Sequence, residues 1–182
     1  MKVTALLLID LQNDYFPGGS NPLVNSTEAV MNAKLVLQNF REKQLPVFHV
    51  QHFATQPGST FFLPGTRGAE IHPEVAPVET ENIIIKHTPN SFVETTLLSE
   101  LRDTSVREIV VCGMMTHMCV DTTVRAARDY GFKCRLIADA CATRDLQVFD
   151  KIISADEVHH AFLAALNGFY AAVINTEQYL NL

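Results

Sequence analysis

Three side chains of different chemistry each follow an apolar run in the sequence. Asp10 comes directly after LLLI, Lys86 comes directly after NIII, and Cys119 lies shortly beyond VVCG. Taken singly, each has an ordinary explanation: the aspartate caps a turn, the lysine faces water, and the cysteine packs inside a helix. Taken together, a carboxylate, an ammonium and a thiol are the groups required for nucleophilic catalysis by cysteine. The sequence therefore predicts that the three residues lie in one site.

Cys119 falls near the start of a predicted helix, in the stretch GMMTHMCVDTTVRAA. With Thr116 as the N-cap, the cysteine is the third helical residue, among backbone N–H groups that have no helical partner. These N–H groups and a nearby Lys86 ammonium favour a thiolate over a thiol. Asp10 can take the thiol proton and return it to a leaving group, while the N–H groups hold a carbonyl oxyanion. This arrangement predicts acyl transfer through a thioester.

The elements that must position these residues alternate between short apolar runs and helical patterns. The runs are continuously apolar, which is typical of parallel strands covered on both faces. The alternation predicts an α/β fold with a doubly wound parallel sheet and helices on both faces. Predicted strands span 3–9, 46–51, 82–86, 107–113, 134–138 and 171–175, and predicted helices span 26–43, 92–103, 117–130 and 155–168.

In such a sheet, ligands bind beyond the carboxyl ends of the strands, which is where Asp10, Lys86 and Cys119 fall. One long segment, 53–81, is rich in proline and glycine and has no predicted element. Loops of that length in a compact domain usually serve as lids or contact another subunit. The sequence contains no repeat or linker, so residues 1–182 form a single predicted domain.

Composition and short motifs argue against several classes of protein. The 182 residues carry a net charge of −6 without a basic run, which argues against binding to nucleic acid or to an anionic membrane. The apolar N-terminal run is too short to span a membrane and lacks a cleavage site, so we expect a cytoplasmic protein. DLQNDYFPGGS is not a G-x-G-x-x-G turn, which argues against a dinucleotide cofactor. The four cysteines contain no C-x-x-C pair, which argues against a zinc knuckle.

The segments around the three reactive residues resemble a known family. LLLIDLQNDYF, IIIKHTPNSF and VVCGMMTHMCVDTTVRAARDYGF resemble the isochorismatase-like cysteine hydrolases, which include nicotinamidases and N-carbamoylsarcosine amidohydrolase. The resemblance covers essentially the whole chain. It implies a three-layer, Rossmann-like fold with a six-stranded parallel sheet, and a catalytic triad of Asp10, Lys86 and Cys119. It also implies a small-molecule substrate and a homo-oligomer, a dimer or higher.

The resemblance further implies a backbone feature next to the nucleophile. Members of the family carry a non-proline cis peptide bond just before the nucleophile's helix, and the matching bond is Met114–Met115. Such a turn can direct the N–H of Met115 and the N–H of Cys119 at one point, which would form an oxyanion hole. The alternative is an ordinary trans turn, in which the helix N–H groups alone hold the oxyanion.

The chain departs from two branches of this family. True isochorismatases generally lack the nucleophilic cysteine, so its presence favours hydrolysis of a carbon–nitrogen bond over hydrolysis of a vinyl ether. Nicotinamidases carry an Asp-x-His pair and a further histidine that hold a metal, whereas the matching stretch VQHFATQ has no aspartate. His52 and His72 alone make an incomplete metal site. We therefore expect activity without a metal or another cofactor.

Other residues near the triad in the sequence are candidates for the substrate pocket. Packing explains the two phenylalanines among them equally well, and the glutamine either contacts the substrate or braces Asp10. Cys141 follows the fifth run, where a packed thiol is the simpler explanation, and His159 is expected at the surface or at an interface. The five pocket candidates are Gln12, Phe16, His52, Phe92 and His117.

Three hypotheses about function follow from these observations. The leading one is a cysteine-dependent amidase that acts on a small amide or ureido compound through a thioester. The second is an isochorismatase-type hydrolase in which Cys119 is incidental, and the third is a non-catalytic protein that binds a ligand or senses oxidation through its thiol. Turnover by a Cys119→Ala variant separates the first two. Ammonia release from a panel of small amides separates the first from the third.

Overall fold

The computed structural model describes residues 3–182. Its main sheet contains β1 (Val3–Ile9), β2 (Val47–His52), β3 (Asn82–Lys86), β4 (Val106–Met114), β5 (Lys133–Ala142) and β8 (Ala172–Ile174). The order across the sheet is β3-β2-β1-β4-β5-β8, and every neighbouring pair is parallel. The chain therefore winds outwards from β1 in both directions, which confirms the predicted doubly wound sheet of six strands.

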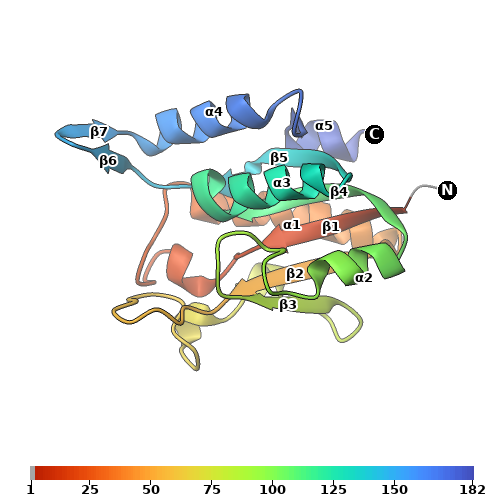
Figure 1. Cartoon of the computed structure of the whole chain (residues 1–182), viewed down its shortest axis with the longest axis horizontal. Coiled ribbons are helices and arrows are strands. Elements are labelled where there is room, and N and C mark those ends of the chain that lie inside the picture. Colours follow the sequence, from red (N-terminus) through yellow and green to blue (C-terminus); the bar gives the residue numbers. More distant parts are fainter. Residues whose placement is uncertain (1–2) are drawn as a thin grey trace.

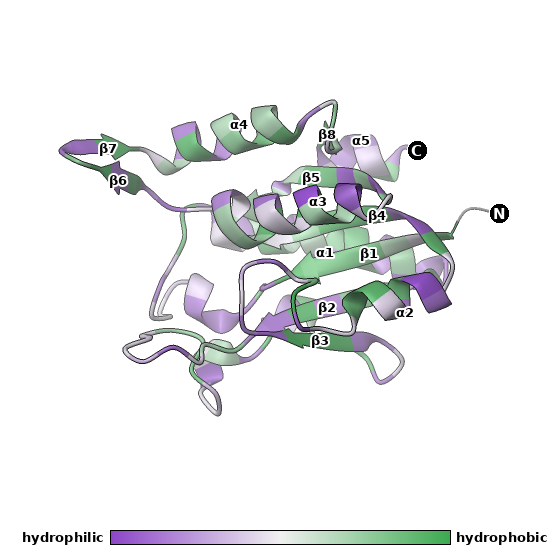
Figure 2. Ribbon diagram, viewed as in Figure 1, coloured by the Kyte–Doolittle hydropathy of each residue, from purple (hydrophilic) through white to green (hydrophobic). Residues whose placement is uncertain are grey.

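Helices cover both faces of the sheet (Figure 1). On one face lie α1 (Ser26–Glu42) and α5 (Thr176–Leu180), and on the other lie α2 (Leu97–Asp103), α3 (Asp121–Asp129) and α4 (Ala155–Leu166). The side chains of β1 alternate between these layers: Leu6 and Leu8 pack with α1, whereas Leu7 and Ile9 pack with α2 and α3. Because both faces are buried, β1 is a continuous hydrophobic run in the sequence (Figure 2).

Two predicted helices begin later in the structure than their sequence pattern suggests. Thr95 Oγ1 donates to Ser91 O at 2.6 Å and accepts from Leu97 N at 3.3 Å, so the segment predicted as helical from residue 92 becomes regular only at Leu97. The predicted helix 117–130 opens with one wide turn, Thr116–Val120, before the regular α3. Sequence periodicity does not detect either change, because the spacing of apolar residues is similar in a turn and in a helix.

Two short strands and one short α-helix have no counterpart among the predicted elements. β6 (Leu146–Val148) and β7 (Lys151–Ile153) form an antiparallel hairpin that projects beyond the body of the molecule (Figure 1). α5 follows β8 and begins with a capping box between Asn175 and Gln178. Each element is too short to produce a periodic pattern. None of the helices within residues 3–182 is long and apolar enough to cross a membrane.

Candidate active site

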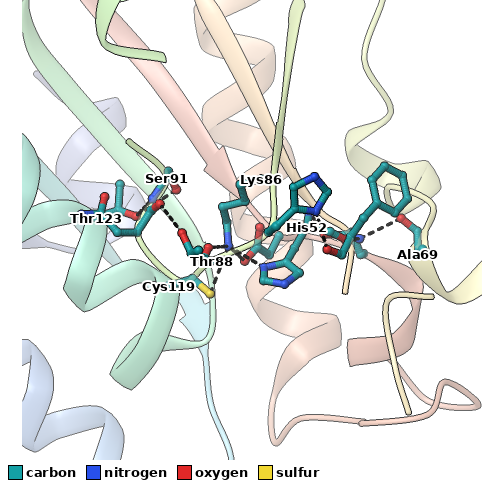
Figure 3. Close-up of polar contacts among 12 residues, drawn as sticks. His52, Ala69, Lys86, Thr88, Ser91, Cys119 and Thr123 are labelled. Atoms are coloured by element: carbon teal, nitrogen blue, oxygen red, sulfur yellow. Dashed lines mark hydrogen bonds and ion pairs between the residues drawn. The ribbon is translucent and has the colours of Figure 1, made fainter. Parts of the chain in front are cut away.

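The three reactive side chains meet at the carboxyl edge of the sheet (Figure 3). Lys86 Nζ lies 2.8 Å from Asp10 Oδ2 and 3.3 Å from Cys119 Sγ. The side chains of the lysine and the aspartate are fully buried, and the cysteine is 5% exposed. The structure therefore brings together the three residues that the sequence analysis singled out.

Each of the three residues is positioned by the end of an element. Asp10 directly follows β1, and its left-handed backbone conformation (φ 52°) turns the chain out of the sheet. Lys86 is the last residue of β3 and is in register with His52 of β2. Cys119 lies in the wide turn between β4 and α3. Because β2 separates β1 from β3, the lysine side chain extends over the end of β2 to reach Asp10.

The loop after Lys86 is fastened to the helix after Cys119 (Figure 3). Ser91 N donates to Thr123 Oγ1 at 3.1 Å, and the two hydroxyl groups lie 2.9 Å apart. Both residues are fully buried. A buried pair of hydrogen bonds thus holds the elements that carry the ammonium and the thiol at a fixed separation.

The Lys86 ammonium contacts every other polar group of the site. Burial alone would lower the pKa of Lys86, but the negative charges of Asp10 and Cys119 outweigh burial, and the pKa is raised. An ammonium has three N–H donors. Besides Asp10, its acceptors are His52 Nδ1 at 2.9 Å and Thr88 O at 3.0 Å. The Cys119 sulfur, at 3.3 Å, is a fourth acceptor, so the three donors of the ammonium are shared among four groups.

The surroundings raise the pKa of the Cys119 thiol, opposite in direction to the lowering expected from Lys86 and the helix N–H groups. Burial and the negative charge of Asp10 raise the pKa of Cys119, and the positive charge of Lys86 opposes them only in part. Burial of the thiol and the carboxylate beside it both disfavour the thiolate, and neither effect can be seen in the sequence. An oxygen of Asp10 lies within 4.8 Å of Sγ, so a proton acceptor is adjacent to the thiol.

Thr116 has different partners from those of an N-cap, which corrects the expectation for this residue. Its hydroxyl donates to Ala142 O at 3.3 Å and lies 2.9 Å from His159 Nδ1. His159 comes from α4 and is half-buried, rather than lying free at the surface. The first residue of the wide turn is thereby tied to β5 and to α4, two elements that carry none of the triad.

The peptide bond between Met114 and Met115 is cis. Met115 is buried, and its carbonyl oxygen accepts hydrogen bonds from Met118 N at 3.0 Å and from Val120 N at 3.3 Å. These two bonds close the wide turn around Cys119. The two N–H groups expected to bind the oxyanion therefore belong to this turn (Cys119) and to the residue directly before it (Met115). Their binding of an oxyanion stays a prediction.

His52 contacts the lysine of the triad. Its Nδ1 accepts a hydrogen bond from Lys86 Nζ, and burial together with the positive charge of Lys86 lowers the pKa of His52 to about 4. The ring is therefore neutral at neutral pH, accepts at Nδ1 and carries its proton on Nε2. This expected pocket residue orients the ammonium.

Gln12 braces the backbone at the end of β2, and its role as a substrate contact stays a prediction. Its Nε2 donates to His52 O at 2.9 Å and to Ala69 O at 2.8 Å, and its Oε1 accepts from His52 N at 2.8 Å (Figure 3). The side chain is fully buried. Both of its polar groups are used inside the protein, so Gln12 fixes the end of β2 against the long segment 53–81.

The remaining pocket candidates divide into two groups. Phe16 packs against His72 with ring centroids 4.1 Å apart and the rings tilted by 40°, and both line a cavity of about 520 Å³ between residues 13–20 and 60–73. His117 is half-buried and hydrogen-bonds Thr143 Oγ1 through Nδ1. Phe92 is different, because it is buried in the hydrophobic core and stacks with Phe132. Packing accounts for Phe92, which shares this cluster with Cys119, and its role as a pocket wall stays a prediction.

Asp14 joins the two walls of this cavity and was not among the predicted site residues. Its Oδ2 accepts from Phe62 N at 2.6 Å, and its Oδ1 accepts from Ser20 N at 3.1 Å. A Cβ atom on Gly68 would lie 2.1 Å from Oδ1, which explains why a glycine occupies that position. A single acidic residue in a polar loop gives no sequence signal for such a role, because its partners are distant backbone N–H groups.

Tyr15 is a second residue that the sequence analysis did not single out. It is buried and packs edge-on against Phe62, with ring centroids 4.6 Å apart. Burial and the negative charges of Cys119 and Asp10 raise the pKa of Tyr15 well above its usual value. The phenol of Tyr15 is therefore neutral in its buried position next to Phe16.

The residues around the triad do not fit a metal ion. Asp10, His52 and Cys119 offer ligand atoms within 4.8 Å of one another, but the Lys86 ammonium contacts all three residues. A metal cation at this point would have to displace that ammonium or meet its positive charge. His72, the second histidine of the expected metal site, accepts a hydrogen bond from Glu74 N at 3.3 Å and packs against Phe16 instead.

The doubly wound sheet and the polar cluster at its carboxyl edge define an α/β protein of a hydrolase class. Residues 4–178 match the family model of the isochorismatase domain, and the chain belongs to the isochorismatase family of hydrolases. It is 53% identical over 177 residues to YddQ, an uncharacterized isochorismatase family protein of Bacillus subtilis (strain 168), with 97% of this chain and 98% of that protein covered.

Two further comparisons concern proteins with named activities. The crystal structure of an isochorismatase from Pseudomonas putida KT2440 is similar to this chain with a TM-score of 0.91 and 36% identity, covering 96% of this chain and 89% of that one. Nicotinamidase 3 of Arabidopsis thaliana is 29% identical over 189 residues, which is 97% of this chain and 87% of the plant protein.

Proposed function

We propose that this protein is a cysteine-dependent amidase that hydrolyses a carbon–nitrogen bond of a small amide or ureido substrate. One observation carries the proposal: the buried Lys86 ammonium lies 2.8 Å from the Asp10 carboxylate and 3.3 Å from the Cys119 sulfur, so that a thiol, a carboxylate and an ammonium meet in one place. The similarity to a nicotinamidase, a protein named for action on an amide, supports the type of bond.

Asp10 is the proton acceptor in the first step. It removes the proton from Cys119 Sγ, and the thiolate attacks the carbonyl carbon of the substrate, so that the carbonyl oxygen becomes an oxyanion. The pair of Asp10 and Cys119 carries one proton and one negative charge before and after this transfer. The Lys86 ammonium therefore faces the same total charge throughout, and its raised pKa keeps it protonated.

The leaving group departs in the second step. Protonated Asp10 donates its proton to the leaving nitrogen, the carbon–nitrogen bond breaks, and the acyl group remains on Cys119 Sγ as a thioester. A water molecule then gives a proton to Asp10 and attacks the thioester carbon. The carbon–sulfur bond breaks, the acid is released, and Asp10 returns the proton to the thiolate. The N–H groups of Met115 and Cys119 hold the oxyanion in both attacks.

Ammonia release from a panel of small amides and ureido compounds tests this proposal. Wild-type protein and a Cys141→Ala control should turn over at least one compound, whereas Cys119→Ala should not; both thiols are 5% exposed, so the two variants remove equally buried groups. The intact mass of wild-type protein quenched during turnover should show the added acyl group.

Two outcomes would contradict the amidase proposal. A Cys119→Ala variant that keeps full turnover would favour an isochorismatase-type reaction in which the thiol is incidental. A protein that turns over no compound in the panel but undergoes reversible oxidation at Cys119 would favour the thiol-sensing alternative.

A further inference from the structure

One cavity of the protein has no part in the proposed reaction. It lies between residues 13–20 and 60–73, has a volume of about 520 Å³, and is lined by none of Asp10, Lys86 and Cys119. Both segments follow strands of the sheet, β1 and β2, and they lie together beyond its carboxyl edge (Figure 1). Sites for small molecules usually measure about 300–1,000 Å³, so this cavity has the size of a ligand site.

The walls of this cavity are held in place without a ligand. Asn13 Nδ2 donates to Arg67 O at 2.9 Å, and Asn13 N donates to Glu70 O at 3.0 Å. The Asp14 carboxylate also joins the two segments, because it accepts hydrogen bonds from a backbone N–H group of each. A site that is already formed loses little conformational entropy when a ligand binds.

The lining of the cavity carries a positive charge that the protein does not neutralise. Arg67 is the one lysine or arginine in the lining, and no ion pair within residues 3–182 involves it. An arginine side chain is always charged and has several N–H donors. The one lining carboxylate, Asp14, already accepts two backbone N–H groups. Burial lowers the pKa of His72, whose Nδ1 accepts from Glu74 N, so its neutral ring carries the proton on Nε2.

Apolar side chains line the cavity from both segments. Phe16 and Pro17 come from the first segment, and Leu63 and Pro73 come from the second. The Leu63 side chain is 39% exposed, so a ligand that covers it would remove apolar surface from water, which favours binding. A ligand that matches this lining therefore has an apolar body as well as a negative charge.

We propose that this cavity is a binding site, separate from the triad, for a small organic carboxylate with an apolar body. The carboxylate pairs with the Arg67 guanidinium, because the planar fork of N–H groups matches its two oxygens. The apolar body packs between Phe16 and Leu63. A single cation favours a monoanion, since a phosphate monoester would bring a second negative charge near the Asp14 carboxylate. The proposal does not rest on the amidase activity, because no residue of the triad takes part in binding.

Isothermal titration calorimetry with benzoate, phenylacetate and hexanoate as probes tests the site without turnover. We expect saturable binding of at least one probe to the wild-type protein, and binding weaker by about tenfold or more in Arg67→Gln, which loses the ion pair. Leu63→Glu, which adds a carboxylate to the lining, should weaken binding in the same way. Arg102→Gln, at an exposed arginine of α2 outside the cavity, is the control and should bind like the wild type. The uncharged counterparts benzyl alcohol, 2-phenylethanol and hexanol should bind more weakly than the three carboxylates.

A crystal structure with the tightest-binding probe locates the site directly. We expect the carboxylate of the probe within hydrogen-bond distance of the Arg67 guanidinium. A carboxylate bound to the Lys86 ammonium instead would overturn the proposal, as would a wild type that binds none of the three probes saturably or an Arg67→Gln variant with wild-type affinity. Circular dichroism should show wild-type spectra for Arg67→Gln and Leu63→Glu, because both side chains are exposed. These results are separate from the test of the amidase proposal, because none of them requires turnover.

Discussion

His159 Nδ1 lies 2.9 Å from Thr116 Oγ1, a contact that joins α4 to the turn carrying the proposed nucleophile. The same hydroxyl donates to Ala142 O of β5 at 3.3 Å. Burial and the positive charge of His160 lower the pKa of His159, so the ring is neutral at neutral pH. The position of the turn around Cys119 thus depends on a side chain from a helix that supplies no member of the triad.

Replacement of His159 by leucine should lower kcat with little change in KM. We expect a loss of about 10-fold, less than the 10²–10³ typical of a lost oxyanion donor, because the N–H groups are misplaced but not removed. The exposed neighbour His160, replaced in the same way, is the control. A Thr116→Val/His159→Leu double variant should lose no more kcat than the worse of the two single variants. Both changes remove the same hydrogen bond, the one between Thr116 Oγ1 and His159 Nδ1. Normal kcat in His159→Leu would refute the role in positioning.

Asp10→Asn and Lys86→Met should each lower kcat by about 10²–10⁴ on a substrate identified by the amide panel. The first change removes the proton acceptor, and the second removes the charge that stabilises both anions. The double variant should lose less than the product of the two single losses, because the residues act in one step. Lys43→Met, at an exposed lysine, controls for loss of charge. Near-normal turnover in either triad variant would be incompatible with the mechanism.

Glu81 fastens the end of the long segment 53–81 to α1 and β2. It accepts hydrogen bonds from Arg41 Nε at 2.7 Å and Val78 N at 3.0 Å, and it lies 2.8 Å from His49 Nε2. Burial acts to raise the pKa of Glu81, but these partners prevail and lower it to about 2. The stability that Glu81 confers is therefore fully present above pH 4.5, the value for an unperturbed glutamate, and is lost as pH falls towards 2.

Glu81→Gln should consequently lower the thermal midpoint at pH 7 and should make it fall less steeply than in the wild type between pH 5 and pH 2.5, a window set by the shift from 4.5 to about 2. Glu79→Gln, at an exposed position in the same segment, should leave both the midpoint and its pH dependence unchanged. Thermal unfolding followed by circular dichroism measures both. Parallel curves for the wild type and Glu81→Gln would show that the carboxylate does not contribute.

Exhaustive chelation should leave activity intact. The Lys86 ammonium contacts Asp10, His52 and Cys119, the three residues that could otherwise supply metal ligands at the triad. Activity after dialysis against a strong chelator, compared with mock-dialysed protein, is the measurement. Loss of activity that zinc or iron restores would mean that a metal site exists despite this ammonium.

The positions of Asp10, Lys86 and Cys119 could be predicted from the sequence, because continuous apolar runs mark buried parallel strands whose carboxyl ends share one edge. The raised pKa of Cys119 could not, since it depends on burial and on the distance to Asp10, which only the folded chain determines. The hydrogen bonds of Gln12 could not be predicted either, because its partners are backbone groups that lie 40 and 57 residues away in the sequence.

The Asp14 carboxylate connects the two loops around the cavity through backbone N–H groups alone. Every amino acid except proline supplies such a group, so the residues at positions 20 and 62 can change without loss of either hydrogen bond. Gly68 is constrained, because any side chain there would collide with the carboxylate. Mutation can therefore vary the polarity and size of the side chains that line the cavity while the two loops keep their path, as long as aspartate and glycine stay at positions 14 and 68.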